Sequence, residues 1–198
     1  MTKIKNLYGL ILAGGFSKRM GQDKALMVYH GQPQIEYVND LLAANCEQVF
    51  LSKRPDQSNY KEIASINDEQ ELSSIGPLGG ILSAMKKYPH ASWLIMACDL
   101  PFVTQETLEY LIERRDSEKA ATAFKSTSDG LPEPLCAIWE AQAYLKILEF
   151  LKKDIRCPRK VLINSDINLL EQKNPRWLDN VNDLKEFEQA MGELGKFN

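Results

Sequence analysis

The segment LILAGGFSKRMGQDKAL, residues 10–26, combines residue types that could bind a polyphosphate. Gly14 and Gly15 directly follow an apolar run, and the cations Arg19 and Lys24 come a few residues later. Glycine permits positive φ and leaves no side chain to block a close approach, so successive backbone amides can converge on an oxyanion. Arg19 could add a forked contact to phosphate oxygens, and Lys24 a mobile positive charge. The segment therefore predicts a site for a polyphosphate.

An ordinary strand-to-helix turn with surface cations is the competing interpretation of this segment. Two glycines alone would favour that turn, but two glycines followed by Arg19, Gly21, Asp23 and Lys24 favour phosphate binding. The spacing matches neither the P-loop, GxxxxGK[ST], nor the dinucleotide fingerprint, GxGxxG. A different kind of nucleotide site is therefore expected.

Asp99 follows the apolar run WLIMAC and is the candidate metal ligand. A single carboxylate suits Mg²⁺, which usually keeps several waters and takes further ligands from phosphates. A cap or turn aspartate before Pro101 is the alternative, and the phosphate-binding segment favours the metal. We expect Asp99 to hold Mg²⁺, Gly14, Gly15 and Arg19 to hold the outer phosphates, and Lys24 to neutralise charge at the reacting phosphate.

Three further places could contact a ligand. The segment GPLGGILSAM, residues 76–85, predicts a helix whose N-terminus could face an anion, with Gly79 and Gly80 against a base or sugar. Tight helix–sheet packing explains the same glycines equally well, and both interpretations stay open. Asp68 could accept hydrogen bonds from a base or ribose, although a loop carboxylate is more often simply solvated. Asn180 and Asn182 are similarly ambiguous, and Asn182 is expected to be a helix N-cap.

Alternating strand-like and helix-like patterns predict the elements that position these residues. Strands are expected over residues 8–12, 49–51, 63–66, 93–97, 120–124 and 135–139, and helices after Pro33, Pro77 and Thr104 and over residues 144–151 and 183–191. Residues 154–180 give no clear pattern. Such alternation predicts a mostly parallel sheet with helices on both faces. Ligands bind such sheets at the carboxyl ends of the strands, where residues 13, 52, 67 and 99 begin the loops.

Composition narrows the class of protein. The chain has 198 residues, 44% of them hydrophobic, which predicts a single domain spanning residues 1–198. A net charge of −3 argues against non-specific nucleic-acid binding. No segment approaches the roughly 20 apolar residues of a membrane span. The four cysteines lack the spacing of a zinc site and suggest a reducing, cytoplasmic environment.

The motifs together resemble a known family. LILAGGFSKRMGQDKAL resembles the signature LAGGxSxRMGxDKxL of the nucleotidyltransferase superfamily, and in particular the molybdenum cofactor guanylyltransferases. GPLGGILSAM, ACDLPFV, PEPLCAIW and DNVND are similar to later segments of that family. The resemblance covers nearly the whole chain and is most specific over residues 10–26, 76–85 and 97–102.

The resemblance implies a three-layer, Rossmann-like α/β fold and a specific reaction. GMP would pass from MgGTP to the terminal phosphate of molybdopterin, releasing pyrophosphate and giving molybdopterin guanine dinucleotide. Partners would be GTP and molybdopterin, together with molybdoenzyme chaperones or other proteins of the cofactor pathway. The resemblance implies nucleotide contacts by Leu12, Ala13, Gly14, Lys24 and Asp68, nucleotide and metal contacts by Asp99, and an acceptor-side role for Asn180 and Asn182.

The chain also departs from the family pattern. Ser52 stands where the family usually has asparagine, and Asp183-Leu184 replaces the usual Thr-Pro after Asn182. These differences leave nucleotidyl transfer intact but leave the base and the acceptor open. The alternatives are a cytidylyltransferase, another nucleotidyltransferase acting on molybdopterin or on a sugar or alditol phosphate, or a nucleotide-binding module without turnover.

Overall fold

The computed structural model describes residues 4–13, 23–53, 60, 63–68, 71–72 and 75–194. In this part of the chain seven strands form one sheet in the order β3-β2-β1-β4-β6-β5-β7. The strands are β1 (Ile4–Leu12), β2 (Cys46–Lys53), β3 (Ser65–Asn67), β4 (Ser92–Ala97), β5 (Ala121–Lys125), β6 (Pro132–Trp139) and β7 (Ile167–Leu170).

Strand direction divides the sheet into two parts. β3, β2, β1 and β4 are mutually parallel neighbours, and β5 is parallel to β7. β6 lies between β4 and β5 and is antiparallel to both. The expected mostly parallel sheet is therefore confirmed, with one reversed strand inside it.

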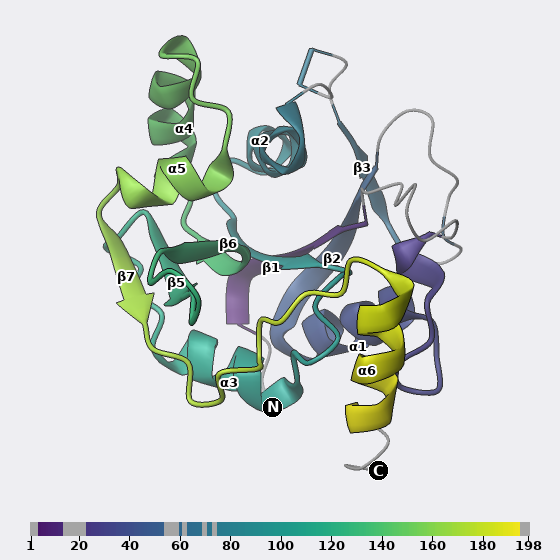
Figure 1. Cartoon of the computed structure of the whole chain (residues 1–198). Coiled ribbons are helices and arrows are strands. Elements are labelled where there is room, and N and C mark those ends of the chain that lie inside the picture. Colours follow the sequence, from purple (N-terminus) through teal and green to yellow (C-terminus); the bar gives the residue numbers. More distant parts are fainter. Residues whose placement is uncertain are drawn as a thin grey trace.

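Helices cover both faces of this sheet and make three layers (Figure 1). One layer contains α2, α4 and α5, and the other contains α1 and α3, while α6 packs beside the sheet near η1. The helices are η1 (Lys24–Leu26), α1 (Gln34–Asn45), α2 (Pro77–Lys87), α3 (Gln105–Glu113), α4 (Ala143–Lys152), α5 (Pro158–Ile163) and α6 (Leu184–Leu194). The expected three-layer α/β fold is confirmed.

β4 shows why the sheet is covered on both sides. All six of its residues are buried. Leu94 and Met96 join the core beneath α1 and α3, whereas Trp93 and Ile95 join the core beneath α2, α4 and α5. Because successive side chains of a strand point to opposite faces, an uninterrupted apolar run needs a helix layer on each face.

Local start signals place two helices as expected. α2 begins at Pro77, whose fixed φ suits the first helical position, after Gly76 in the left-handed region at φ 63°. Thr104 caps α3, where its side chain accepts a hydrogen bond from the backbone N–H of Thr107. Both helices therefore start at the sheet edge where β3 and β4 end.

α5 and β7 lie within residues 154–180, for which no clear pattern could be read from the sequence. α5 has six residues and β7 has four, too few for a periodic pattern to emerge.

All four cysteines are free thiols, and Cys157 is the exposed one. None of the helices in the described part of the chain has the length and apolar character needed to cross a bilayer.

Candidate active site

The candidate site lies at the edge of the sheet where the parallel strands end. Leu12 pairs with Ser52 of β2 on one side and with Ala97 of β4 on the other, and β3 ends beside β2. Ala13 and Asp68 directly follow β1 and β3, and Asp99 comes two residues after the end of β4, so they share one edge of the sheet. These three residues therefore lie at the carboxyl ends of the parallel strands, where the sequence predicts them.

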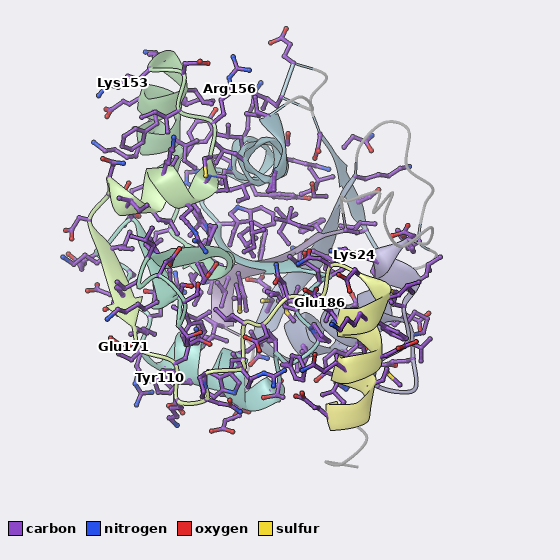
Figure 2. All side chains as sticks on the ribbon, viewed as in Figure 1. Lys24, Tyr110, Lys153, Arg156, Glu171 and Glu186 are labelled. Atoms are coloured by element: carbon purple, nitrogen blue, oxygen red, sulfur yellow. The ribbon has the colours of Figure 1, made fainter. Side chains whose placement is uncertain are left out.

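Lys24, Asp99 and Asn182 meet at this edge from three distant parts of the sequence. The Lys24 Nζ atom donates to Asn182 Oδ1 at 2.9 Å and lies 3.6 Å from Asp99 Oδ2. The Lys24 side chain is 17% exposed and that of Asp99 is 30% exposed, so both reach solvent. Figure 2 shows Lys24 beside the first turn of α6, the helix that carries Glu186. The ammonium group is therefore held between a carboxylate and an amide at an accessible surface.

Asp23 fixes the short helix that carries Lys24. Its Oδ1 atom accepts a hydrogen bond from the backbone N–H of Ala25 at 3.0 Å, which caps η1. The Tyr60 hydroxyl donates to the other carboxylate oxygen of Asp23 at 2.5 Å. Burial, reinforced by that hydrogen bond, raises the pKa of Tyr60, so the phenol remains a donor at neutral pH. The backbone position of Lys24 thus depends on Asp23 and Tyr60.

Negative charge accumulates around Lys24. Burial, together with the nearby carboxylates of Asp99 and Glu186, raises the pKa of Tyr29 to about 12. Burial also raises the pKa of the Cys98 thiol, and Asp99 and Asp23 add to that effect. Among the described residues, the carboxylates of Asp99, Asp23 and Glu186 therefore influence groups at this edge, where Lys24 pairs with Asp99.

The residues before α6 are tied to Asp99 and to the helix. The Val181 backbone N–H donates to the Asp99 carbonyl at 2.9 Å. The Asn182 N–H donates to Glu186 Oε2 at 2.7 Å, and the Glu186 N–H donates to Asp183 Oδ1 at 2.9 Å. Asp183 is therefore the N-cap of α6, and the expectation that Asn182 would cap this helix was wrong. The Asn182 side chain instead binds Lys24, and Asp183 with Glu186 starts the helix without the Thr-Pro of the family pattern.

Removal of this cap should weaken α6 measurably. We expect Asp183→Ala to lower the free energy of unfolding by about 1 kcal/mol, because the Glu186 N–H would lose its acceptor. Urea denaturation followed by circular dichroism would measure the loss. Asp183→Asn keeps a capping oxygen and should retain most of the stability. Equal losses in both variants would contradict the assignment of Asp183 as the cap.

A cavity of about 500 Å³ adjoins Asp99 on the side of the reversed strand. It is lined by six stretches of the chain, which include the start of β6, helix α5 and the loops that follow β4 and β5. Its lining comprises Asp99, Leu100, Ser126, Thr127, Ser128, Glu133, Pro134, Leu135, Cys136, Arg159, Gln172, Leu178, Asp179 and Asn180. Asn180 and Asp99 therefore connect this cavity to the Lys24 cluster.

Arg159 is the cation of this cavity that the sequence did not single out. Its guanidinium contacts Asp129 Oδ2 at 2.8 Å and Glu133 Oε1 at 2.5 Å. These contacts join α5 to the turn between β5 and β6. That turn contains the hydroxyl-rich segment STSDG, residues 126–130. Its approach to Arg159 depends on α5, for which the sequence offered no pattern.

The other expected site residues have different placements. Ala13 is 6% exposed at the end of β1, and Asp68 accepts a hydrogen bond from Ser52 at 2.8 Å. Gly79 is buried, and a Cβ there would lie 2.1 Å from the Leu72 carbonyl oxygen, which gives glycine a packing reason. Gly14, Gly15 and Arg19 lie outside the described residues.

The carboxylate oxygens available at this edge suit a hard metal cation. Among the described residues, no group of three or more His, Cys, Asp or Glu side chains could enclose a metal ion. Asp99 offers a single partly exposed carboxylate beside Lys24 at this edge. A hard cation that takes its remaining ligands from phosphates and water, such as Mg²⁺, fits that arrangement.

The fold and this site define an α/β nucleotidyltransferase. The family model described as the MobA-like NTP transferase domain matches residues 9–167, and the chain therefore belongs to that family. It is 39% identical over 186 residues to a molybdenum cofactor biosynthesis bifunctional protein of Synechocystis. That match covers 92% of this chain and 53% of the relative, so the chain spans about half the length of that protein.

Full-length relatives and solved structures agree with the family. A probable molybdenum cofactor guanylyltransferase of Bacillus cereus is 30% identical over 195 residues, covering 94% of this chain and 96% of the relative. The crystal structure of molybdopterin-guanine dinucleotide biosynthesis protein A from Archaeoglobus fulgidus superposes with a TM-score of 0.76 at 23% identity, covering 96% of this chain and 99% of that one. A 2-C-methyl-D-erythritol 4-phosphate cytidylyltransferase from Thermus thermophilus gives 0.68 at 10% identity, covering 97% and 98%. Both structural likenesses concern the fold.

Proposed function

We propose that this chain transfers GMP from GTP to the terminal phosphate of molybdopterin and releases pyrophosphate. The observation that carries the proposal is the meeting of Lys24, Asp99 and Asn182 directly beside the cavity that Asn180 lines. One side of this cluster is the edge of the parallel strands, and the other is a cavity for a second substrate. The guanylyltransferase relatives support GTP and molybdopterin as the two substrates.

The reaction joins two phosphates. An oxygen of the acceptor phosphate attacks the α-phosphorus of GTP, the new P–O bond forms, and the bond to the β-phosphate oxygen breaks. The acceptor phosphate is already ionised at neutral pH, so the step needs no general base. Catalysis then depends on orientation and on charge stabilisation.

Different residues of this chain would orient the substrates and stabilise the charge. Lys24 neutralises charge at the α-phosphate or the incoming acceptor, and Asn182 orients its ammonium group. Asp99 would hold Mg²⁺, which when bound neutralises the triphosphate and the leaving pyrophosphate. Asn180, which lines the adjoining cavity, would contact the acceptor. Roles for Gly14, Gly15 and Arg19 at the β- and γ-phosphates and for Leu12, Ala13 and Gly79 at the nucleotide remain predictions from the sequence.

A panel of nucleotides tests this function. Purified protein with molybdopterin and Mg²⁺ should release pyrophosphate with GTP much faster than with CTP, ATP or UTP, and EDTA should stop the reaction. A preference for CTP would support a cytidylyltransferase instead. Triphosphate binding without pyrophosphate release, with molybdopterin or with sugar or alditol phosphates, would indicate a binding module. A cytoplasmic location and contacts with molybdoenzyme chaperones remain predictions from the sequence.

A further inference from the structure

The segment between β7 and α6 is anchored in the main core of the protein. Trp177 is 3% exposed and packs against Tyr110 of α3 and Phe124 of β5, with ring centroids 5.7 Å apart in both pairs. Lys173 lies over the Tyr110 ring, with its Nζ atom 4.7 Å from the centroid. Figure 1 shows this segment running from β7 past α3 to the start of α6. The segment is therefore held in place before α6 begins.

α6 itself is held by much less apolar contact. Of the residues of α6, all of which the structure describes, Ala190 alone is buried. It joins Met27, Tyr29 and Val181 in a small cluster apart from the two large cores, and Phe187 packs against that cluster. A cavity of about 400 Å³ lies between α6 and the segment before it. Elements with few buried contacts open locally at low free-energy cost, so α6 depends on its polar contacts to stay docked.

Arg176 joins three parts of the chain at the far end of α6. Its Nη1 atom lies 2.7 Å from Glu193 Oε2 in the last turn of the helix. Its guanidinium carbon lies 4.7 Å from the centroid of the Phe102 ring, and its Nε atom forms an ion pair with Asp179. Phe102 belongs to the same loop as Asp99. A planar guanidinium can pair with carboxylates and lie on an aromatic ring at once, so Arg176 closes α6 against the segment and this loop.

The opposite end of α6 is the one that reaches the candidate site. The Asn182 side chain accepts the hydrogen bond from Lys24, and the Asn182 N–H donates to Glu186 in the first turn of α6. Glu193 lies about 10 Å further along the helix, because an α-helix rises about 1.5 Å per residue. Arg176 is therefore remote from Lys24 and is connected to it through α6.

We propose that Arg176 is a positioning residue for nucleotidyl transfer. By closing the far end of α6, it holds Asn182 where the amide oxygen orients the Lys24 ammonium group. Without this latch α6 would open locally, and Asn182 would release Lys24 for part of the time. The inference rests on the proposed function for the reaction in which Lys24 takes part.

Arg176→Gln tests the inference through turnover. We expect kcat for pyrophosphate release to fall about tenfold, because a small displacement of an orienting group slows a reaction strongly, while the KM for GTP stays within about twofold. Glu193→Gln breaks the same ion pair from the helix side and should lower kcat in the same way. Wild-type kcat in Arg176→Gln would overturn the inference.

Arg114→Gln is the matched control. The Arg114 side chain is 43% exposed, as is that of Arg176. It also lies over an aromatic ring, that of Tyr110, and pairs with a carboxylate, that of Glu113. These contacts belong to α3 and do not involve α6, so the control should keep the wild-type kcat. An equal loss in the control would overturn the inference.

A double-mutant cycle separates positioning from general damage. In an Asn182→Ala background, Arg176→Gln should cause no further loss of kcat, because its effect passes through the missing amide. Additive losses would overturn the inference. Thermal unfolding checks that each variant is folded.

Hydrogen exchange of the protein without substrates tests the latch apart from the reaction. Arg176→Gln should speed exchange of the α6 amides and of the Asn182 N–H about tenfold, while the amides of β4 keep their rates. Unchanged exchange in α6, or equal acceleration throughout the protein, would overturn the inference. Wild-type protein without turnover would defeat the proposed function, and faster exchange confined to α6 and Asn182 in the variant would still support the latch.

Discussion

Asp99→Ala is expected to lower the rate of pyrophosphate release by about a hundredfold or more, while the protein remains folded. Asp99 is partly exposed at the end of β4, and its side chain contacts Lys24 rather than the apolar core. Under the proposed function, its loss removes the carboxylate that would hold the metal of the triphosphate, at little cost to packing. The measurement is a continuous pyrophosphate assay at saturating GTP and molybdopterin, with thermal unfolding in parallel.

Asp166→Ala provides the matched control for this experiment. Asp166 is 77% exposed and pairs with Lys119 at the opposite edge of the sheet, where β5 and β7 begin. Asp166→Ala removes the same kind of carboxylate on the opposite side of the sheet from the candidate site. Turnover should therefore remain at the wild-type level. Wild-type turnover in Asp99→Ala itself would refute the assignment of this carboxylate to the reaction.

Glu140→Ala is expected to cause the largest loss of stability among single replacements of charged residues in this structure. Glu140 is 2% exposed and forms a closed network with Arg115 and Ser92. The Arg115 guanidinium contacts Glu140 twice at 2.7 Å, and the Ser92 hydroxyl donates to Glu140 at 2.6 Å. Removing the carboxylate would leave a largely buried guanidinium without its counter-charge, at a cost of about 3 kcal/mol.

Urea denaturation of Glu140→Ala would measure this cost. The double variant Arg115→Met/Glu140→Leu removes both charges and should recover much of the loss, because no unpaired charge would remain buried. Asp166→Ala, which breaks an exposed pair, should leave stability unchanged within error. The network lies at the start of β4, away from the candidate site, so folded Glu140→Ala should keep its turnover. A single variant as stable as the wild type would contradict the prediction.

The sequence predicted the elements whose signals are local. The apolar run of β4 and the start signals Pro77 and Thr104 each lie within a few residues of the element that they define, and the structure confirms them. The order of strands could not be read in the same way. Both strands of the β5–β6 hairpin are apolar, and only long-range pairing places β6 rather than β5 against β4.

The candidate site was predictable to a similar extent. Residues just past the ends of parallel strands, such as Asp99 and Asp68, could be placed at one edge of the sheet because topology alone brings them there. Two adjacent candidates, Asn182 and Asp183, could each have capped α6. Lys24, more than 150 residues away, determines the outcome by binding the Asn182 side chain. Arg159 was missed because its contacts with Glu133 and Asp129 depend on tertiary structure.

Because β6 runs antiparallel to its neighbours, substrate preference can change in this fold without a change in the rest of the chain path. Parallel strands must be joined by long crossover segments, so the nucleotide edge is tied to the packing of whole helices. The wall of the cavity formed by residues 126–131 is instead a hairpin turn, which can lengthen, shorten or change composition without rerouting the chain. Under the proposed function, grafting this turn between family members is expected to change acceptor preference and to leave the triphosphate chemistry unchanged.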